Sequence, residues 1–288
     1  MIFSPIMLSY VLEIGGADIP MKISVLGGGT IGSAIAEALH KNGHEVTVTR
    51  RSVEKISQLA KIGIEVTSRN DKAAEDSEIV IIAMKPYDAL AVLKDISGAT
   101  KGKLVISMVA AVKERQIKSL IPEATVVRAM TNVAAKVGGG FTVYCSKNLT
   151  EENEKKVVKL LECFGETEKV EEKYMDALTA LGGSGPAYIF TIIEAMVYGG
   201  LKVGLPRDLA LRDSYQTIMG AAKLVAESGD HPSQLKDLVT TPGGVTIDAL
   251  YELEDSGIRT AFMRAIEAAT DKAKIISDAL ENFDGQQK

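Results

Sequence analysis

Two short glycine-rich stretches carry the residues whose types and spacing could do chemistry. The first, GGGTIG, places Gly27, Gly29 and Gly32 in the pattern G-x-G-x-x-G between an apolar run and an amphipathic one. In that context the first glycine permits a tight turn, the second lets the backbone approach a pyrophosphate, and the third lets helix and strand pack closely. The N–H groups of the helix N-terminus would face the phosphates. We therefore expect a dinucleotide site that includes Thr30 and Ile31; a glycine-rich turn without a ligand is the alternative.

The end of the second expected strand indicates which dinucleotide binds. Chains that bind NAD usually carry Asp or Glu about 20 residues after the glycines, where the carboxylate holds the ribose 2′-hydroxyl. In VTVTRRS that place is taken by Arg50, Arg51 and Ser52. Guanidinium groups and a hydroxyl suit a 2′-phosphate, because arginine offers paired, charge-assisted donors. The sequence predicts NADPH as the cofactor, with NADH possible at lower affinity; two solvated arginines at a strand end are the alternative.

Two more strand ends could reach the cofactor, because the carboxyl ends of strands in such a sheet face the ligand cleft. The run EIVIIAMKPYD brings Ala83, Lys85 and Pro86 to this edge. The lysine could approach the ribose or the nicotinamide, and the proline would fix the turn; a surface lysine is the alternative. The run RAMTNVAAKVGGG brings Asn132 to the same edge. Its amide could orient the nicotinamide or the substrate, or it could cap a turn.

The second glycine-rich stretch is TTPGGVTI, from Thr240 to Ile247, and an amphipathic run follows it. A Gly-Gly turn that leads into a helix can expose several N–H groups together, which makes a small anion-binding nest. The polarity of the helix adds partial positive charge. The stretch is therefore either an anion site with hydroxyl groups beside it or a loop that begins a helix.

The elements that must position these residues begin with a sheet. Near-continuous apolar strands alternate with helical patterns from Met21 onward, which indicates a parallel sheet covered on both faces. Right-handed crossovers make this a doubly wound (Rossmann) α/β fold. The expected strands are 22–27, 45–50, 64–68, 78–85, 103–109, 124–130, 140–145 and 166–172, and the helices among them are 30–43, 52–63 and 151–165.

Helical periods alone continue from residue 173 to the end of the chain. We expect three parts: an N-terminal extension (1–20), a dinucleotide-binding domain (21–172) and a helical dimerisation and substrate domain (173–288). Runs such as YIFTIIEAMV and TAFMRAIEAATDKAKII are apolar on more than one face. Such helices need cover, so the sequence predicts a homodimer whose helical domains pack together.

The amino-acid composition limits the classes of partner that the protein is expected to bind. The net charge of −5 and the pI near 5.4 give no global attraction to nucleic acid or to an anionic membrane, and we expect neither as a partner. The two cysteines, Cys145 and Cys163, match neither a metal-ligand spacing nor a CxxC motif. We expect no metal, two free thiols and a reducing compartment, the cytoplasm.

The most apolar run is AYIFTIIEAMVYGGLKVGL, which contains Glu194 and Lys202. A membrane-spanning helix needs about 18 or more apolar residues with few charges, so we interpret this run as a buried helix. The leading residues MIFSPIMLSYVLEIGGADIP lack a basic start and are a poor match to a signal peptide. Their role is open.

Three segments follow one another in the helical domain: DALTALGGSGPAYIFTIIEAM, GGLKVGLPRDLA and HPSQLKDLVTTPGGVTIDALYELEDSGIR. Together they resemble the pyrroline-5-carboxylate reductase family, and the resemblance extends over about Met21 to Leu280. It implies reduction of a cyclic imine, 1-pyrroline-5-carboxylate, to L-proline by NAD(P)H, the last step of proline biosynthesis. It also implies a dinucleotide-binding domain followed by a helical dimerisation domain, as the periods suggest.

The resemblance gives the TPGGVT stretch a role. It implies that backbone amides around Gly243, Gly244 and Val245 hold the substrate carboxylate, and that the hydroxyl of Thr246 lies at the imine nitrogen as the catalytic contact. Thr241 stands where the family has a serine and keeps the hydroxyl. The resemblance further implies sites that draw on a neighbouring subunit, in dimers or rings of dimers.

The chain departs from the family pattern near the end of the strand at 124–130. The family string resembles MPNTP, whereas this chain has MTNVA from Met130 to Ala134, without either proline. The departure puts the role of Asn132 in doubt.

Other classes share the first domain. The β-hydroxyacid dehydrogenases place a catalytic lysine on the helix that follows the glycine-rich interdomain segment, but here that helix has no lysine before Lys202. The deazaflavin-dependent NADP reductases lack a helical domain of this length. A non-catalytic NADPH sensor would need no TPGGVT site. We expect an imine reductase.

Overall fold

The computed structural model describes residues 20–285, so the N-terminal extension expected at 1–20 lies almost wholly outside the described residues. The described chain divides into two compact units, one made of residues 20–186 and 265–285 and the other of residues 187–264. The expected boundary at 172 lies where the sheet ends, while the compact units divide at 186. The three-part division stays a prediction.

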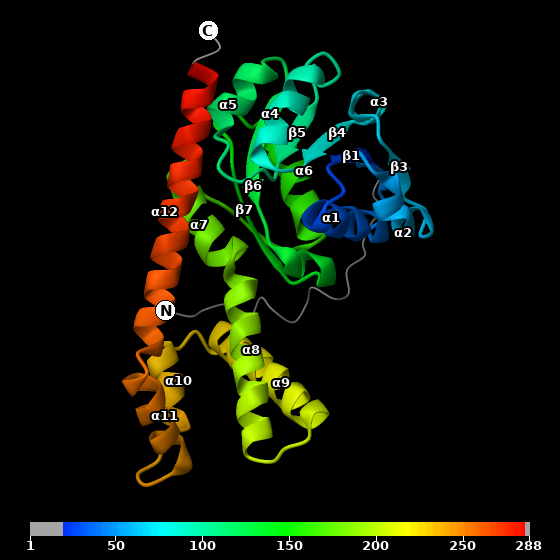
Figure 1. Cartoon of the computed structure of the whole chain (residues 1–288). Helices are drawn as coiled ribbons and strands as arrows, with labels where there is room; N and C mark the ends of the chain where they lie inside the picture. Colours follow the sequence, from blue (N-terminus) through cyan, green and yellow to red (C-terminus); the bar gives the residue numbers. More distant parts are fainter. Residues whose placement is uncertain (1–19, 286–288) are drawn as a thin grey trace. The chain divides into compact units, whose positions relative to one another are not determined.

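The first unit is built on an eight-stranded sheet in the order β3-β2-β1-β4-β5-β6-β7-β8 (Figure 1). Strands β1 to β6 pair in parallel, in the strand order 3-2-1-4-5-6 of doubly wound dinucleotide-binding folds, so the expected fold class is confirmed. The strands are β1 Lys22–Leu26, β2 Glu45–Thr49, β3 Glu65–Thr67, β4 Ile79–Ile82, β5 Leu104–Ser107, β6 Thr125–Met130, β7 Gly140–Cys145 and β8 Gly165–Lys169.

Strand β7 departs from the expected parallel pattern, because it pairs antiparallel with β6. Only the short 3-10 turn η2 (Val133–Val137) stands in the connection between these strands. A parallel crossover needs a dozen or more residues, so this connection can only turn the chain back. Strand β8 then pairs in parallel with β7 after helix α6 (Glu151–Glu162).

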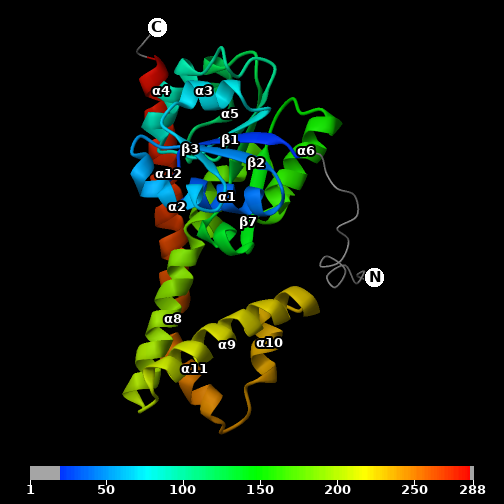
Figure 2. The same ribbon diagram turned by 90° about the vertical axis from the view of Figure 1, so that its right-hand side faces the viewer.

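Helices cover both faces of the sheet, as Figure 2 shows from the side. Side chains of β4 alternate between two cores: Ile79 and Ile81 lie on the face covered by α1 and α6, and Val80 and Ile82 lie on the other. The second face is covered by α4, α5 and the C-terminal part of α12, which contributes Leu280. The bounds are α1 Thr30–Lys41, α3 Asn70–Glu75, α4 Pro86–Asp95, α5 Glu114–Leu120 and α12 Ile258–Gly285.

The helix expected at 52–63 is shorter than predicted. It consists of the 3-10 turn η1 (Val53–Ile56) and the single turn α2 (Ser57–Ala60). Ile56 and Leu59 are fully buried, and two side chains three residues apart need only one helical turn to reach the core. Gly63, at a φ of +94°, then leads the chain into β3.

A compound segment leads from the sheet to the long helix α8 (Gly185–Lys202). It contains the 3-10 turn η3 (Glu172–Tyr174), the single turn α7 (Met175–Leu178) and the π-helical turn η4 (Thr179–Gly183). The N–H of Ser184 donates to the carbonyl of Thr179 five residues back at 2.9 Å, which is the bond of a π turn. Isolated π turns often occur at functional sites.

The second unit consists of helices and the loops between them, and most of its residues are exposed to solvent. It contains most of α8, α9 (Arg207–Ser228), α10 (Pro232–Leu238), α11 (Val245–Asp255) and the start of α12. Among residues 187–264, only Val197, Ala210 and Ser214 are buried. The apolar run expected to be a buried helix is therefore exposed over most of α8 in the single chain.

One described segment, Glu172–Lys202, is long and apolar enough to cross a membrane by length and composition alone. A helix covered by another protein surface has the same length and composition, and apolar surface of this extent usually marks an interaction site.

Candidate active site

A cleft of about 1080 Å³ opens at the carboxyl edge of the sheet, where the strand order reverses between β1 and β4. Doubly wound folds bind their ligands at this switch point. The cleft collects most of the residues that the sequence predicts for the cofactor, namely Gly27, Gly29, Thr30, Ile31, Arg50, Arg51, Ser52, Ala83, Lys85 and Pro86. The predicted residues Gly32 and Asn132 do not line it.

The geometry of the glycine loop explains its spacing. Gly27 has a φ of +109°, and a Cβ there would lie 2.4 Å from the carbonyl oxygen of Ala83. A Cβ on Gly32 would lie 2.1 Å from the carbonyl oxygen of Gly27, so this glycine allows helix α1 to pack against the loop. A Cβ on Gly29 would meet nothing within 4 Å, which leaves its backbone open to the cleft. The first-turn N–H groups of α1, from Thr30 onward, have no intrahelical acceptor and suit an anion.

Thr49, at the end of β2, ties the loop to the neighbouring strands. The N–H of Gly27 donates to its carbonyl and to its hydroxyl, each at 3.2 Å. The same hydroxyl lies 2.5 Å from Oδ1 of Asn70, which lines the cleft just after β3. The sequence reasoning missed Asn70, although the strand-end rule used for β2 and β4 applies equally to β3.

The two arginines after β2 have different surroundings. Nη1 of Arg50 donates to the carbonyl of Gly28 at 2.7 Å, so this guanidinium braces the glycine loop. Nη2 of Arg51 lies 3.5 Å from Oδ2 of Asp88 on α4, and the arginine side chain is 90% exposed. Lys55 lines the same end of the cleft and adds a third cation. The cluster suits a phosphate, with Arg51 and Lys55 as the accessible charges.

Lys85 and Pro86 form the start of α4 as expected. Lys85 has extended backbone at the N-cap, and Pro86 occupies the first helical turn, where the N–H that a proline lacks has no acceptor. Both line the cleft.

The other half of the cleft contains residues that sequence reasoning did not single out. Met108 and Ala110 follow β5, Met130 and Thr131 end β6, and Thr179, Gly183 and Ser184 come from η4 and the residue after it. The strand-end rule could have indicated the first four. The η4 residues carry no such signal, because their place depends on how this segment packs on the sheet.

Asn132 has a structural role in the described chain. Its Oδ1 accepts the N–H of Ala134 at 2.9 Å as the N-cap of η2, and its Nδ2 donates to the carbonyl of Gly182 at 2.9 Å. Only 8% of the residue is exposed. Of the two roles expected from the sequence, capping is the one that this geometry supports, and the cofactor role of Asn132 stays a prediction.

The TPGGVT loop lies in the second unit, between α10 and α11. The N–H of Gly244 donates to the carbonyl of Thr241 at 3.0 Å, and Gly243 has a φ of +69°, as the third position of a type II turn requires. A Cβ on Gly244 would lie 2.4 Å from the Thr241 hydroxyl, so a larger residue there would force the Thr241 side chain to move. Val245 is 87% exposed at the first position of α11, and Thr246 follows it.

These local features make the loop a candidate anion nest. The first-turn N–H groups of α11, which belong to Val245 and the residues after it, have no intrahelical acceptor. The hydroxyl of Thr246 makes no hydrogen bond within the described part of the chain. Free donors and a free hydroxyl side by side could hold a carboxylate and a neighbouring polar atom.

The Cys145 thiol is buried at the end of β7. Burial raises the pKa of the Cys145 thiol to about 12, with the Glu172 carboxylate adding to the effect, so this cysteine stays protonated at neutral pH. Among the described residues, no group of three or more His, Cys, Asp or Glu side chains is placed to hold a metal ion.

Comparison with known proteins covers both parts of the chain. Residues 172–276 match the family model for pyrroline-5-carboxylate reductase dimerisation. Residues 22–111 match the family model described as NADP oxidoreductase, coenzyme F420-dependent. The first match falls on the helical region and the second on the glycine loop and the cleft-lining strands.

Similar proteins extend over nearly the whole chain. A pyrroline-5-carboxylate reductase of Methanosarcina acetivorans is 39% identical over 88% of this chain and 97% of its own length. That of Glycine max is 35% identical over 88% of this chain and 96% of its own length. The crystal structure of Plasmodium falciparum pyrroline carboxylate reductase with NADP bound has a TM-score of 0.83 at 31% identity, covering 89% of this chain and 98% of the other.

Proposed function

The chain belongs to the pyrroline-5-carboxylate reductase family, and from that premise we propose how its residues carry out the reaction. It is an NAD(P)-dependent oxidoreductase that reduces the C=N bond of 1-pyrroline-5-carboxylate to give L-proline, in proline biosynthesis. The observation that carries this assignment is the 39% identity to a pyrroline-5-carboxylate reductase along 97% of that relative's length.

We propose that NADPH is the preferred cofactor and that NADH binds more weakly. The pyrophosphate would lie at the N-terminus of α1 against Gly29, Thr30 and Ile31. Arg51 would hold the 2′-phosphate together with Ser52, while Arg50, already bonded to Gly28, would keep the loop in shape. The NADP-bound structure of the Plasmodium relative supports this preference.

The nicotinamide would lie in the opposite half of the cleft. The adenosine ribose belongs beside β2 and the pyrophosphate at α1, so the remaining half over the ends of β4, β5 and β6 receives the nicotinamide. Ala83, Lys85 and Pro86 border this half from β4, and Met108 and Met130 border it from the next two strands.

We propose that the TPGGVT loop binds the substrate. N–H groups of Gly243 and Val245 would hold the carboxylate, beside the Thr241 hydroxyl, while Gly244 closes the turn through its N–H bond to the Thr241 carbonyl. The Thr246 hydroxyl would bond to the ring nitrogen and leave the imine carbon free to face the cofactor.

The reaction requires no strongly basic side chain. Bound NADPH supplies a hydride to the imine carbon. The protein's share is to hold that carbon in place, which can contribute several kcal/mol and up to roughly 7–11 kcal/mol in the best oriented reactions. The Thr246 hydroxyl would stabilise the nitrogen as it changes from imine to amine. Threonine is too weak an acid to act alone as a general acid, so a substrate that arrives protonated from water is the simplest source of the proton.

The helical region indicates that the chain forms a homo-oligomer, because the family model that it matches is that of a dimerisation domain. We propose a homodimer, or a ring of dimers, in which each active site combines the cleft of one subunit with the TPGGVT loop of another. Exposed apolar side chains of α8 and α9, including Phe190, Tyr198 and Leu211, would be covered by the partner. We place the protein in the cytoplasm, because a reducing compartment suits its two free cysteines.

The test is to mix the purified protein with 1-pyrroline-5-carboxylate and NADPH, and separately with NADH. Loss of reduced-nicotinamide absorbance is followed while proline is assayed. Fast oxidation of NADPH with matching formation of proline, and slower oxidation of NADH, is expected. No oxidation by protein that binds NADPH would mean a different substrate.

A further inference from the structure

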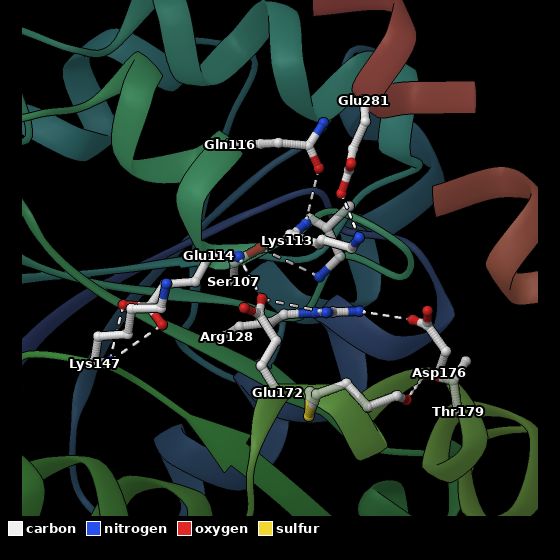
Figure 3. Close-up of polar contacts among 12 residues, drawn as sticks. Ser107, Lys113, Glu114, Gln116, Arg128, Lys147, Glu172, Asp176, Thr179 and Glu281 are labelled. Atoms are coloured by element: carbon white, nitrogen blue, oxygen red, sulfur yellow. Dashed lines mark hydrogen bonds and ion pairs between the residues drawn. The ribbon is translucent and has the colours of Figure 1, made fainter. Parts of the chain in front are cut away.

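The wall of the cleft that η4 supplies rests on a charge cluster around one buried arginine (Figure 3). Arg128 lies on β6 with 1% of its surface exposed, the largest fully buried side chain in the described chain. Its Nη2 lies 3.1 Å from Oδ1 of Asp176 in α7, and its Nη1 lies 3.4 Å from Oε1 of Glu172 in η3. One guanidinium on the sheet therefore contacts two carboxylates of the segment that leads into η4.

The carboxylates are also tied to other elements. Oε1 of Glu172 accepts the N–H of Glu114 at the start of α5 at 2.7 Å. The Glu114 carboxylate in turn accepts the N–H of Lys147 with both oxygens, at 3.0 and 3.1 Å. Figure 3 shows Arg128 between Glu172 and Asp176, with Glu114 and Lys147 continuing the series of bonds to one side. Glu172 is thus anchored from two sides, whereas Arg128 is the one side-chain partner of Asp176 among the described residues.

A buried ion pair is a poor way to gain stability, because desolvation can cost more than the attraction returns. Its geometry is specific, however, since the planar guanidinium holds carboxylates in fixed directions. The arrangement here fixes the position of Asp176 relative to the sheet. Thr179, the first residue of η4 and a residue of the cleft wall, follows Asp176 by three positions, so its position depends on that of Asp176.

The end of β6 holds η4 at its far side as well. Nδ2 of Asn132 donates to the carbonyl of Gly182 at 2.9 Å, and the Met130 sulfur lies 3.8 Å from the place where a Cβ of Gly183 would be. Met130 lies on the same face of β6 as Arg128, because side chains of a strand alternate with a period of two. Strand β6 and the residues just after it therefore contact the chain before the π turn and at the end of the turn, and Met130 itself lines the cleft.

We propose that Arg128 is a positioning residue for hydride transfer: through Asp176 it holds η4 so that Thr179, Gly183 and Ser184 form the wall of the nicotinamide half of the cleft. The inference rests on the proposed function, which puts the nicotinamide over the ends of β4 to β6. Arg128 touches neither cofactor nor substrate in this arrangement. It acts by setting the shape of the wall against which the nicotinamide lies.

The test compares two isosteric variants, each of which neutralises one of the two carboxylates that contact the Arg128 guanidinium. Asp176→Asn weakens the hold on η4, and Glu172→Gln is the matched control, because it acts on η3 and keeps an acceptor for the N–H of Glu114. A small misplacement of the reacting groups costs on the order of tenfold to a hundredfold in rate. We expect Asp176→Asn to lower kcat by about tenfold or more, and Glu172→Gln to lower it by less than about threefold.

A half-cofactor separates positioning from general damage. Adenosine 2′,5′-bisphosphate contains the adenine and 2′-phosphate end of NADPH and lacks the nicotinamide, so its affinity reports only the β2 half of the cleft. Its dissociation constant should be the same in the wild type and in Asp176→Asn. Leu161→Ala, which removes a fully buried side chain from α6, serves as the variant that loses stability away from η4.

Equal losses of kcat in Asp176→Asn and Glu172→Gln would overturn the proposal. So would a loss of bisphosphate affinity in Asp176→Asn as large as its loss of NADPH affinity, or a fall in kcat for Leu161→Ala as large as that for Asp176→Asn. Failure of the wild type to bind the bisphosphate would instead count against the proposed function of the cleft.

Discussion

At the scale of single residues, Arg50 and Arg51 differ in what their guanidinium groups already contact. The first is bonded to the Gly28 carbonyl, and the second is exposed beside Asp88. We predict that Arg51→Ala weakens NADPH by about tenfold or more while NADH changes little, because a hydrogen bond to a charged group contributes roughly 1.5–3 kcal/mol. Arg50→Ala should weaken both cofactors to a similar degree, because it loosens the loop that both would use.

Titration of each variant with NADPH and NADH measures the four affinities. Asp88→Asn is the control: its pair with Arg51 is exposed and contributes roughly 0–1 kcal/mol, so the cofactor preference should barely move. If Arg51→Ala weakened NADH as much as NADPH, the 2′-phosphate assignment would fail.

The Thr246 hydroxyl gives a second prediction at this scale. Thr246→Ala should lower kcat by about tenfold to a hundredfold, the rate equivalent of one lost hydrogen bond to a charged group. NADPH affinity should not change, because the proposed cofactor contacts lie in the other unit. Thr246→Ser, which keeps the hydroxyl, should recover most of the rate. Steady-state kinetics measure the rates, and NADPH titrations measure the affinity. A Thr246→Ala variant that turned over as fast as the wild type would contradict the role assigned to the hydroxyl.

Residues could be predicted from the sequence where the reason for them is local. Two glycines of the loop are an example, because Gly27 has a φ of +109° and a Cβ on Gly32 would meet the Gly27 carbonyl five positions back in the chain. Asn132 could not be assigned, since one of its two partners is the carbonyl of Gly182, fifty positions along the chain. The role of Arg128 could not be predicted for the same reason, because the two carboxylates that it contacts are 44 and 48 positions away in the chain.

At the scale of elements, the sequence predicted the strands well and their directions less well. Continuous apolar runs such as 78–85 and 124–130 indicate buried strands, and β4 and β6 lie within them. The direction of β7 follows from the short connection before it, a length that the expected spans 124–130 and 140–145 already contain but that the apolar pattern of each strand does not express. Helix 52–63 was overestimated, because its amphipathic pattern continues past the two side chains that reach the core.

The attachment of α12 to α5 gives a prediction about pH. The Glu281 carboxylate pairs with Lys113 and Arg115, and these partners hold its pKa below the usual value, with the Lys113 hydrogen bond as the largest cause. A lowered pKa in the folded state means that the pairs stabilise the fold above the unfolded pKa of about 4.3. That stabilisation is lost as the pH falls through the lower folded value.

Glu281→Gln should therefore reduce the free energy of unfolding at pH 7 by about 0.5–1 kcal/mol, and by much less at pH 3. Urea unfolding at the two pH values measures the difference. Glu123→Gln removes the more exposed pair with Lys101 and should have a smaller effect at pH 7. An equal loss for Glu281→Gln at both pH values would show that the charge of Glu281 is not what matters.

At the scale of the whole molecule, the question is whether one chain can complete an active site. The helical unit buries only three of its described residues from 187 to 264, so it needs a partner, and its family model is that of a dimerisation domain. The proposal that the loop of one subunit serves the cleft of another can be tested by mixing two chains that are each impaired in a different part of the site. One carries Thr246→Ala in the loop, and the other carries Gly29→Asp in the cleft.

Gly29→Asp is suited to this experiment, because a Cβ at Gly29 has no atom within 4 Å and the fold should tolerate the change. The new carboxylate would repel the pyrophosphate. In a mixed dimer with shared sites, both defects fall in one site and the other site is wild type, so random mixing leaves about a quarter of all sites intact. Proline formation should rise toward that fraction after co-refolding. If each site were complete within one chain, every site would carry one defect and no activity would return.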